Sequence, residues 1–135
     1  MADSLTAEQR SACMRSVGGK NTAPEMIVRK LAHSMGYRYA LHLKTLPGKP
    51  DLVFASRRKI IFVHGCFWHS HSCLHGRISP VTNVQYWNHK RERNVQRDRE
   101  HISALRMDGW KVLVVWECWT RKPSYIRERL AAFLR

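Results

Sequence analysis

The segment from His64 to Cys73 constrains this chain more than any other stretch of its sequence. It reads His-Gly-Cys-Phe-Trp-His-Ser-His-Ser-Cys and follows directly on an apolar run with the pattern of a strand. Thiols and imidazoles are the ligands of a structural transition metal such as zinc. An imidazole that is not needed as a ligand can transfer protons. The segment therefore predicts a loop that is held by a bound metal ion and that also contains a histidine able to transfer protons.

The charge of the chain indicates a polyanionic partner. Lys and Arg number 24 against 10 Asp and Glu, for a formal net charge of +14 over 135 residues with 5 Trp. This combination favours nucleic acid, with an anionic membrane surface as the alternative. No apolar stretch approaches the roughly 20 residues that span a bilayer. We expect a single domain, residues 1–135, in a reducing cytoplasm where the cysteines bind metal rather than form disulfides.

Local patterns predict the element order α-α-β-β-β-α-β-α, which is an α/β fold. Capping-box spacing starts helices at Thr6 and Thr22, and glycines at 18–19 and 36 end them. Hydrophobic periodicity places the remaining elements. The expected strands are 37–42, 51–54, 59–63 and 110–116, and the expected later helices are 84–107 and 124–133.

The connections predict how the strands pair. Short turns join the first three strands, which should be antiparallel, whereas a helical crossover makes the fourth parallel to the third. The ends of the third and fourth strands, at His64 and Trp116, then lie at one sheet edge with the start of the second at Asp51. Cys66 and Cys118 follow their strands closely and should meet there as well. Residues far apart in the sequence thus converge on one site.

The cysteines and histidines near this edge predict a zinc site. Their spacing after the third strand is C-x4-H-x-C, and a fourth ligand after the last strand completes a closed Cys3His set of the structural type. The favoured ligands are Cys66, His71, Cys73 and Cys118. His69 is close enough in sequence to replace His71, and the alternative to zinc is that the thiols are buried small hydrophobes. We favour His71 because it leaves His69 and His64 for chemistry.

Asp51 and Glu25 are the acidic candidates. Asp51 is the carboxylate that the first three strands place at the shared edge, and a hard oxygen donor there suits Mg²⁺. The alternative is a turn or cap aspartate, which is common after proline. Glu25 is also explained by capping of the helix that follows Thr22.

Aromatic and basic residues beside the site suggest contact with DNA. Phe67 and Trp68 lie between the zinc ligands, where exposed rings can insert between base steps and kink a duplex. The alternative is that one ring packs under the metal. The long helix carries basic residues that can contact phosphate in part, although such a run is ordinarily a solvated face. These residues are Lys90, Arg91, Arg93, Arg97 and Arg99.

Several segments together resemble one known family. They are Met14-Arg15, Leu46-Pro47-Gly48-Lys49-Pro50-Asp51, Val63-His64-Gly65-Cys66-Phe67-Trp68-His69 with His71 and Cys73, Asn94-Val95, and Val114-Val115-Trp116-Glu117-Cys118. In order and spacing these segments are similar to those of the very short patch repair endonucleases. Those bacterial enzymes nick DNA beside T·G mismatches left by deamination of 5-methylcytosine. The likeness covers nearly the whole chain.

The resemblance implies a fold and two metal sites. The fold would be a restriction-endonuclease-like core, with a mixed sheet flanked by helices. A structural Zn²⁺ would be held by Cys66, His71, Cys73 and Cys118, and a catalytic Mg²⁺ by Asp51 and the backbone carbonyl of Val63. The family commonly has Thr at the position of Val63. Valine keeps the carbonyl, so metal binding should survive.

The resemblance also implies roles for individual residues. Asp51, His64 and His69 would be catalytic, with a supporting active-site role for Glu25. The residues that intercalate beside the mismatch would be Phe67, Trp68 and Met14. We expect contacts to the DNA backbone from Arg15, Lys90, Arg93 and Asn94.

The third strand indicates which group activates water. Many restriction-type nucleases carry Glu-x-Lys there, whereas this chain has Val63-His64-Gly65, so an imidazole must replace the lysine. We expect His69 to activate the attacking water, with His64 assisting or contacting phosphate. Mg²⁺ on Asp51 would stabilise the transition state and the leaving 3′ oxygen.

The expected function is that of a monomeric, Mg²⁺-dependent endonuclease associated with the bacterial nucleoid. It would nick one strand of double-stranded DNA 5′ of the mismatched T in a T·G pair, with other repair proteins as candidate partners and no membrane. One alternative is a zinc-stabilised DNA-binding module or degenerate nuclease without catalysis. Another is a His-Asn-His nuclease, whose hairpin-then-helix motif does not match the predicted topology.

Overall fold

A computed structural model describes residues 22–66, 69, 71–73 and 82–135 of the chain. Its elements are α2 (Ala23–Ser34), β1 (Ala40–Leu41), β2 (Leu52–Phe54), η1 (Ala55–Arg57), β3 (Lys59–His64), α3 (Val84–Met107), β4 (Lys111–Trp116), η3 (Glu117–Arg121) and α4 (Pro123–Leu134). The helix expected from Thr6 lies outside the described residues. The other expected elements are all present, although β1 is shorter than the predicted strand 37–42.

The boundaries of the helices follow from local chemistry. The hydroxyl of Thr22 accepts a hydrogen bond from the backbone N–H of Glu25 at 3.4 Å, which caps α2 as the capping box predicted. Gly36, just after α2, and Gly109, just after α3, have φ angles of +87° and +89°. Glycine adopts this left-handed conformation without steric cost, so both helices end where the sequence indicated.

The sheet has the strand order β1-β2-β3-β4. β2 pairs antiparallel with both β1 and β3, and β3 pairs parallel with β4. The parallel register runs from Lys59 opposite Lys111 to His64 opposite Trp116. This confirms the pairing predicted from the connections, and it places the ends of β3 and β4 side by side.

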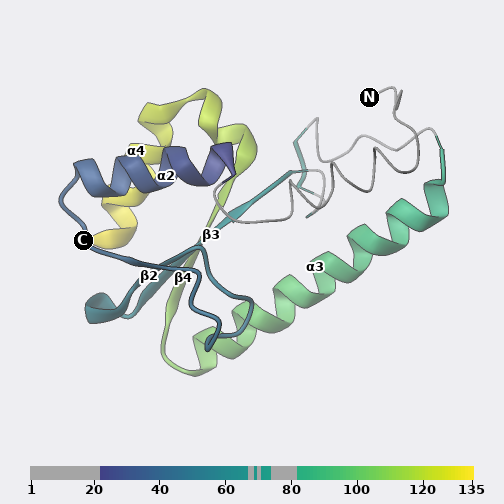
Figure 1. The fold of residues 1–135 in the computed structure, drawn as a ribbon, viewed down its shortest axis with the longest axis horizontal. Coiled ribbons are helices and arrows are strands. Elements are labelled where there is room, and N and C mark those ends of the chain that lie inside the picture. Colours follow the sequence, from purple (N-terminus) through teal and green to yellow (C-terminus); the bar gives the residue numbers. More distant parts are fainter. Residues whose placement is uncertain (1–21, 67–68, 70, 74–81) are drawn as a thin grey trace.

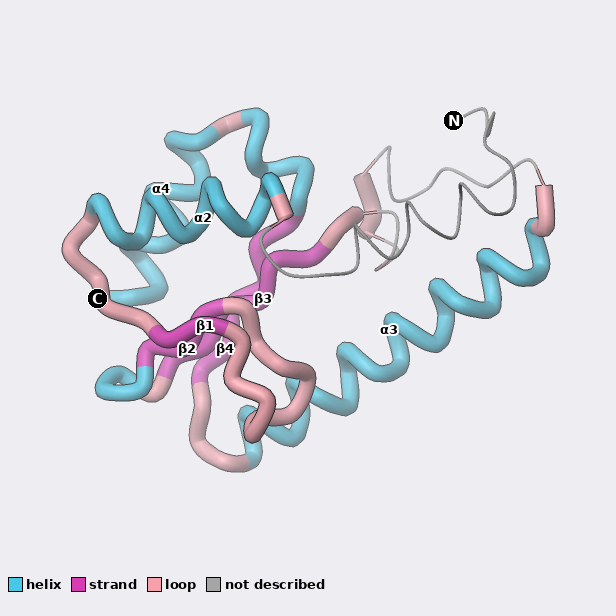
Figure 2. The backbone as a smooth tube through the Cα atoms, viewed as in Figure 1, coloured by secondary structure: helices cyan, strands magenta, loops and turns pink. Residues whose placement is uncertain are grey.

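Helices cover both faces of this mixed sheet (Figures 1 and 2). α2 and α4 pack on one face, where Ile61 of β3 joins a core that contains Val28 and Leu130. On the other face Ile60 and Phe62 of β3 belong to a second core, which contains Leu105 of α3 and the following Trp110. Successive side chains of a strand point to opposite faces, so the continuous apolar run of β3 is buried on both of them. The expected α/β sheet flanked by helices is confirmed.

α3 is the longest helix, at 24 residues, or about 36 Å at 1.5 Å per residue. Trp87 and Leu105 are buried on it, and Val95 and Ile102 are half-buried, which is the face that the helical spacing predicted. Its C-terminal part packs on the sheet, whereas its N-terminal half extends beyond it (Figure 1). Among the described residues, no helix combines the length and the apolar character needed to cross a membrane.

Candidate metal centre and neighbouring acid–histidine groups

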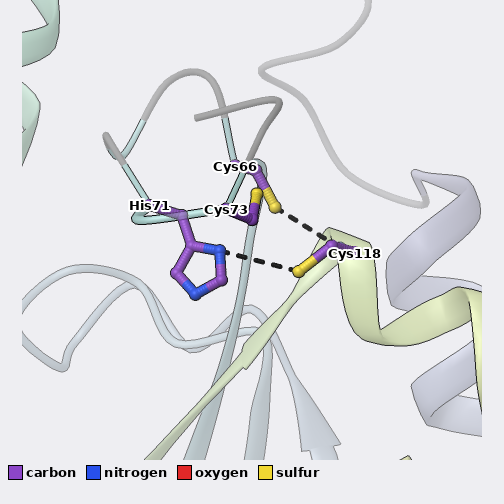
Figure 3. Close-up of side chains that lie close together, drawn as sticks. All are labelled: Cys66, His71, Cys73 and Cys118. Atoms are coloured by element: carbon purple, nitrogen blue, oxygen red, sulfur yellow. Dashed lines mark hydrogen bonds between the residues drawn. The ribbon is translucent and has the colours of Figure 1, made fainter. Parts of the chain in front are cut away.

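Four ligand-type side chains converge just beyond the ends of β3 and β4 (Figure 3). Sγ of Cys118 lies 3.6 Å from Nδ1 of His71, and the backbone N–H of Cys118 donates to Sγ of Cys66 at 3.3 Å. With Cys73 included, all four ligand atoms lie within 4.8 Å of one another. Ligands of a tetrahedral zinc are separated by about 3.5–4 Å, given bonds of about 2.0–2.3 Å. The four residues can therefore hold a metal ion.

The electrostatic surroundings of this cluster favour a bound cation over free thiolates. Cys66 is buried, and burial raises the pKa of its thiol to about 12. Burial also raises the pKa of Cys118. Without a cation, both sulfurs keep their protons at neutral pH. A metal would displace those protons and stabilise the thiolates by direct coordination.

The structure places His71, not His69, among the cysteines. The backbone N–H of His71 donates to the carbonyl of Cys66 at 3.0 Å, and its ring stacks on Trp116 with 4.1 Å between centroids. These contacts turn the His71 imidazole toward Cys118. His69 faces Asp98 of α3 instead.

His64 and His69 form a second group with Asp98. Their rings stack with 3.8 Å between centroids and 6° between planes. Nδ1 of His69 lies 2.5 Å from Oδ2 of Asp98, and Nε2 of His64 lies 3.9 Å from Oδ1 of the same carboxylate. Burial, reinforced by the neighbouring His69, lowers the pKa of His64 to about 3. His64 is thus a neutral imidazole at physiological pH.

Glu25, His42 and Asp51 form a third group. Nε2 of His42 lies 3.0 Å from Oε2 of Glu25, and Nδ1 of His42 lies 4.0 Å from Oδ1 of Asp51. Glu25 is 2 % exposed and also pairs with Arg29 at 3.5 Å. Burial raises the pKa of Asp51 to about 7; the hydrogen bond from Val63 opposes the shift, and the Glu25 charge adds to it. Two neighbouring carboxylates with little access to water repel each other when both are ionised, so a positive charge nearby stabilises them.

The sheet register explains how Asp51 reaches this position. The antiparallel ladder between β2 and β3 runs from Phe54 opposite Lys59 to Leu52 opposite Ile61. Beyond it, the backbone N–H of Val63 donates to Oδ2 of Asp51 at 2.6 Å. The carboxylate thus accepts a hydrogen bond from β3 just past the last paired residues. This contact fixes Oδ2 and leaves Oδ1 directed toward His42.

A cleft of about 720 Å³ opens between α3 and the sheet edge. His64, His69 and Asp98 line it together with Trp116, and the basic residues Arg99 and Arg106 contribute to its wall. His69, whose side chain is 22 % exposed, is therefore accessible from this cleft, where the basic residues suit a ligand that carries negative charge.

Sequence reasoning missed Asp98 and His42. Asp98 lies among the basic residues of the long helix, yet it falls on the stripe formed by Val95, Ile102 and Leu105. A carboxylate on an apolar stripe was the available signal. His42 comes directly after β1, and an antiparallel β1 must end beside the start of β2. That topology already implied a position next to Asp51.

The structure describes only some of the residues expected to contact DNA. Met14, Arg15, Phe67 and Trp68 lie outside the described residues. Lys90, Arg93 and Asn94 lie on α3, where Arg93 is exposed and the other two are half-buried. Their roles stay predictions.

Comparison with known proteins identifies the family. The sequence model of the family described as DNA mismatch endonuclease Vsr matches residues 2–75. The chain is 52 % identical over 134 residues to the type II nicking enzyme V.XorIIP of Xanthomonas oryzae, covering 99 % of this chain and 98 % of that protein. It is 40 % identical over 135 residues to the type II nicking enzyme V.NmeAIP of Neisseria meningitidis, covering 100 % of this chain and 96 % of that protein.

A further relative carries the name of the family itself. The chain is 41 % identical over 121 residues to the DNA mismatch endonuclease Vsr of Escherichia coli, covering 90 % of this chain and 77 % of that protein. These matches confirm the resemblance seen in the motifs. The chain is an endonuclease that belongs to the family of the DNA mismatch endonuclease Vsr.

Proposed function

We propose that this endonuclease cuts one strand of double-stranded DNA 5′ of the mismatched T in a T·G pair, using Mg²⁺ at Asp51. The observation that carries the proposal is the arrangement of Asp51, anchored by Val63, at the same sheet edge as the stacked His64 and His69. The names of the relatives support it, because two are nicking enzymes and one is a mismatch endonuclease.

The residues around Asp51 fit a hard divalent cation. Oδ1 of Asp51 is directed away from the Val63 hydrogen bond, and the buried Glu25 adds a second negative charge nearby. The backbone carbonyl of Val63 is the further oxygen ligand in this proposal. When bound, Mg²⁺ would supply Lewis-acid stabilisation of the charge that develops on the phosphate.

His69 is the group that removes a proton from the attacking water. Because its Nδ1 faces the carboxylate of Asp98, Nδ1 carries the proton and Nε2 is left as the acceptor. The carboxylate stabilises the imidazolium that forms when Nε2 takes up the proton. Attack on phosphorus then breaks its bond to the 3′ oxygen, which takes up a proton from solvent water. The products are a 5′-phosphate and a 3′-hydroxyl.

His64 holds His69 in place during this transfer. Its ring stacks on His69 and meets the ring of Trp116 edge-on, with 5.4 Å between the ring centroids of His64 and Trp116. It stays neutral because burial lowers its pKa to about 3. Of the two roles expected for His64, assistance to His69 is the one its environment favours. A neutral, largely buried imidazole is a poor partner for phosphate charge.

The Cys3His cluster is proposed as a structural Zn²⁺ site. Four protein ligands would fill the coordination shell of a zinc ion and leave no open position for a substrate, which is the mark of a structural site. The metal would tie the loop after β3 to the start of η3 and thereby hold His69 near the sheet. The mixed sheet with helices on both faces supports the restriction-endonuclease-like core.

The residues proposed to recognise the mismatch are those that the family resemblance implies. Phe67, Trp68 and Met14 would insert beside the mismatch, where a T·G step unstacks more easily than a matched one. Arg15, Lys90, Arg93 and Asn94 would contact the backbone and set the register. The protein would act as a single-domain monomer.

The decisive experiment uses a labelled duplex with one T·G mismatch and a T·A duplex of otherwise identical sequence. With Mg²⁺, the wild-type protein should nick only the T-containing strand of the mismatched duplex, and Asp51→Asn should not nick it. Cleavage of both duplexes alike would remove the mismatch specificity but keep a nuclease. Binding without nicking would indicate the degenerate nuclease.

A further inference from the structure

The His42 imidazole lies between the two carboxylates of the proposed metal site. Its Nε2 is 3.0 Å from Oε2 of Glu25, and its Nδ1 is 4.0 Å from Oδ1 of Asp51. Each ring nitrogen thus faces a different acid. The His42 side chain is 13 % exposed, so water replaces neither contact easily.

The backbone of His42 is held in an uncommon conformation. Its φ angle is +50°, in the left-handed region that few non-glycine residues adopt. The residue follows directly on β1, and its backbone N–H donates to the carbonyl of Asp51 at 3.4 Å. Such a conformation persists only where the surroundings hold it, and it is common at ligand-binding positions.

The two contacts of His42 differ in kind. The Nε2 contact is a direct hydrogen bond to a buried carboxylate, which places the proton on Nε2 and the lone pair on Nδ1. The Nδ1–Oδ1 separation of 4.0 Å is too long for a hydrogen bond. Two ligands of one cation, each bonded at about 2.1 Å, are at most about 4.2 Å apart. A cation between Nδ1 and Oδ1 fits this spacing.

We propose that His42 is a nitrogen ligand, through Nδ1, of the cation held by Asp51. This inference rests on the proposed divalent-metal site at Asp51 and extends it. Glu25 then orients the ligating imidazole by accepting its Nε2–H, an arrangement that recurs around metal-bound histidines. An imidazole ligand favours first-row transition cations over Mg²⁺. The site is therefore built to take a cation such as Mn²⁺ in addition to Mg²⁺.

The test uses Mn²⁺ as both ligand and spectroscopic probe. Zinc-loaded wild-type protein is titrated with Mn²⁺, and pulsed electron paramagnetic resonance detects the coupling of a coordinated ¹⁴N. Protein grown with ¹⁵N-labelled histidine should show the ¹⁵N pattern instead, which identifies an imidazole ligand without any substitution. Asp51→Asn shows which part of the Mn²⁺ binding belongs to this site.

His42→Gln is the diagnostic variant, and His69→Gln is its matched control, since His69 is another imidazole near Asp51. His42→Gln should abolish the nitrogen coupling and weaken Mn²⁺ binding by about 10-fold or more, while Mg²⁺ affinity changes far less. His69→Gln should retain the coupling. Circular dichroism and zinc content confirm that each variant is folded.

The outcomes separate this inference from the proposed function. An Asp51-dependent Mn²⁺ signal without nitrogen coupling, or with a coupling that survives His42→Gln, overturns the role of His42 and leaves the Asp51 metal site intact. Absence of any Asp51-dependent binding overturns both. Equal weakening of Mn²⁺ and Mg²⁺ binding by His42→Gln also contradicts the proposal, because the selectivity argument requires a nitrogen ligand.

Discussion

Asp98 and His69 are joined by a hydrogen bond of 2.5 Å between Oδ2 and Nδ1, although they lie on a long helix and on the loop after β3. The same carboxylate lies 3.9 Å from His64, so one side chain of α3 faces both stacked imidazoles. Through this contact the helix that carries the expected phosphate-binding residues also fixes the proposed general base. The proposed docking of DNA on α3 would therefore involve the same helix that orients His69.

Asp98→Asn should therefore reduce nicking without unfolding the protein. An amide cannot stabilise the imidazolium of His69 and does not hold the proton on Nδ1, so kcat should fall by about 100-fold or more. DNA affinity should change little. Single-turnover kinetics with a T·G duplex, measured as a function of pH, give both the rate and the pKa of the base.

The control for Asp98→Asn is Glu100→Gln on the same helix. Glu100 is exposed and accepts a hydrogen bond from Gln96, so its substitution removes an equal charge from α3 away from the histidines. The control should nick at the wild-type rate. Equal losses in both variants would show that Asp98 contributes only to the general charge of the helix.

Removal of zinc should lower the stability of the fold. A cation bound only by the native state stabilises it by about 4 kcal/mol when its free concentration is about 1,000 times Kd. Cys118→Ser removes the ligand in η3, just after the last strand, and should reduce the free energy of unfolding by a similar amount, while zinc content falls. Urea unfolding with and without a chelator measures the difference.

Ser72→Ala is the matched control for the zinc prediction. Ser72 is exposed between His71 and Cys73 and supplies no ligand atom to the cluster. The control protein should keep its zinc and lose stability only when the chelator is added. A chelator that leaves the wild-type melting curve unchanged would contradict a structural metal.

Much of the fold was predictable because it depends on local patterns. The capping box of Thr22, the helix 84–107 and the pairing of four strands were all read correctly from spacing and connection length. The predicted strand 37–42 was too long for a physical reason. Tyr37 and Tyr39 pack edge-on against Phe54 at 6.4 and 5.8 Å between ring centroids, and only Ala40 and Leu41 join the ladder. An apolar pattern indicates which side chains are buried, and the two tyrosine rings are packed in the core as strand residues would be. It does not indicate which backbone groups pair in the sheet.

The site was predictable to the level of which strand ends meet, and no further. Topology brings Asp51, His64 and Cys66 to one edge regardless of side-chain detail. The pairing of His69 with Asp98, and of His42 with Glu25, depends on the rotation of a helix and on a left-handed backbone. The sequence signals at Asp98 and His42 indicate which part of the sheet each residue faces. The partner of each side chain arises from packing between elements that are distant in the chain.

Asp51 should make the magnesium-free protein less stable as pH rises. Burial raises its pKa from 3.8 to about 7 in the folded state, so folding favours the protonated acid. This contribution to stability is fully present below pH 3.8 and is lost as pH rises through about 7. Relative to Asp51→Asn, the wild-type free energy of unfolding should fall over this window by at most about 4 kcal/mol.

The comparison with Asp51→Asn isolates this effect. His64 changes the free energy of unfolding in the opposite direction. Burial lowers its pKa from 6.5 to about 3, so the folded state disfavours the protonated imidazole and loses stability as pH falls below 6.5. Its contribution is common to both proteins and cancels in the difference. Urea unfolding of zinc-loaded protein at several pH values gives the two curves, and Mg²⁺ at pH 8 should stabilise only the wild type. Parallel curves would contradict a raised pKa.

Arg93 tests whether α3 lies against the DNA backbone. Its side chain is exposed on the helix that borders the cleft, so Arg93→Ala should weaken binding to matched and mismatched duplexes equally. Loss of one phosphate contact should also reduce the slope of log K against log salt by about 1. Arg127→Ala removes a charge that is also exposed, but from α4, which covers the opposite face of the sheet, and should leave affinity and slope unchanged. If both variants weaken binding alike, the net charge of the chain draws DNA to it and α3 is not the docking element.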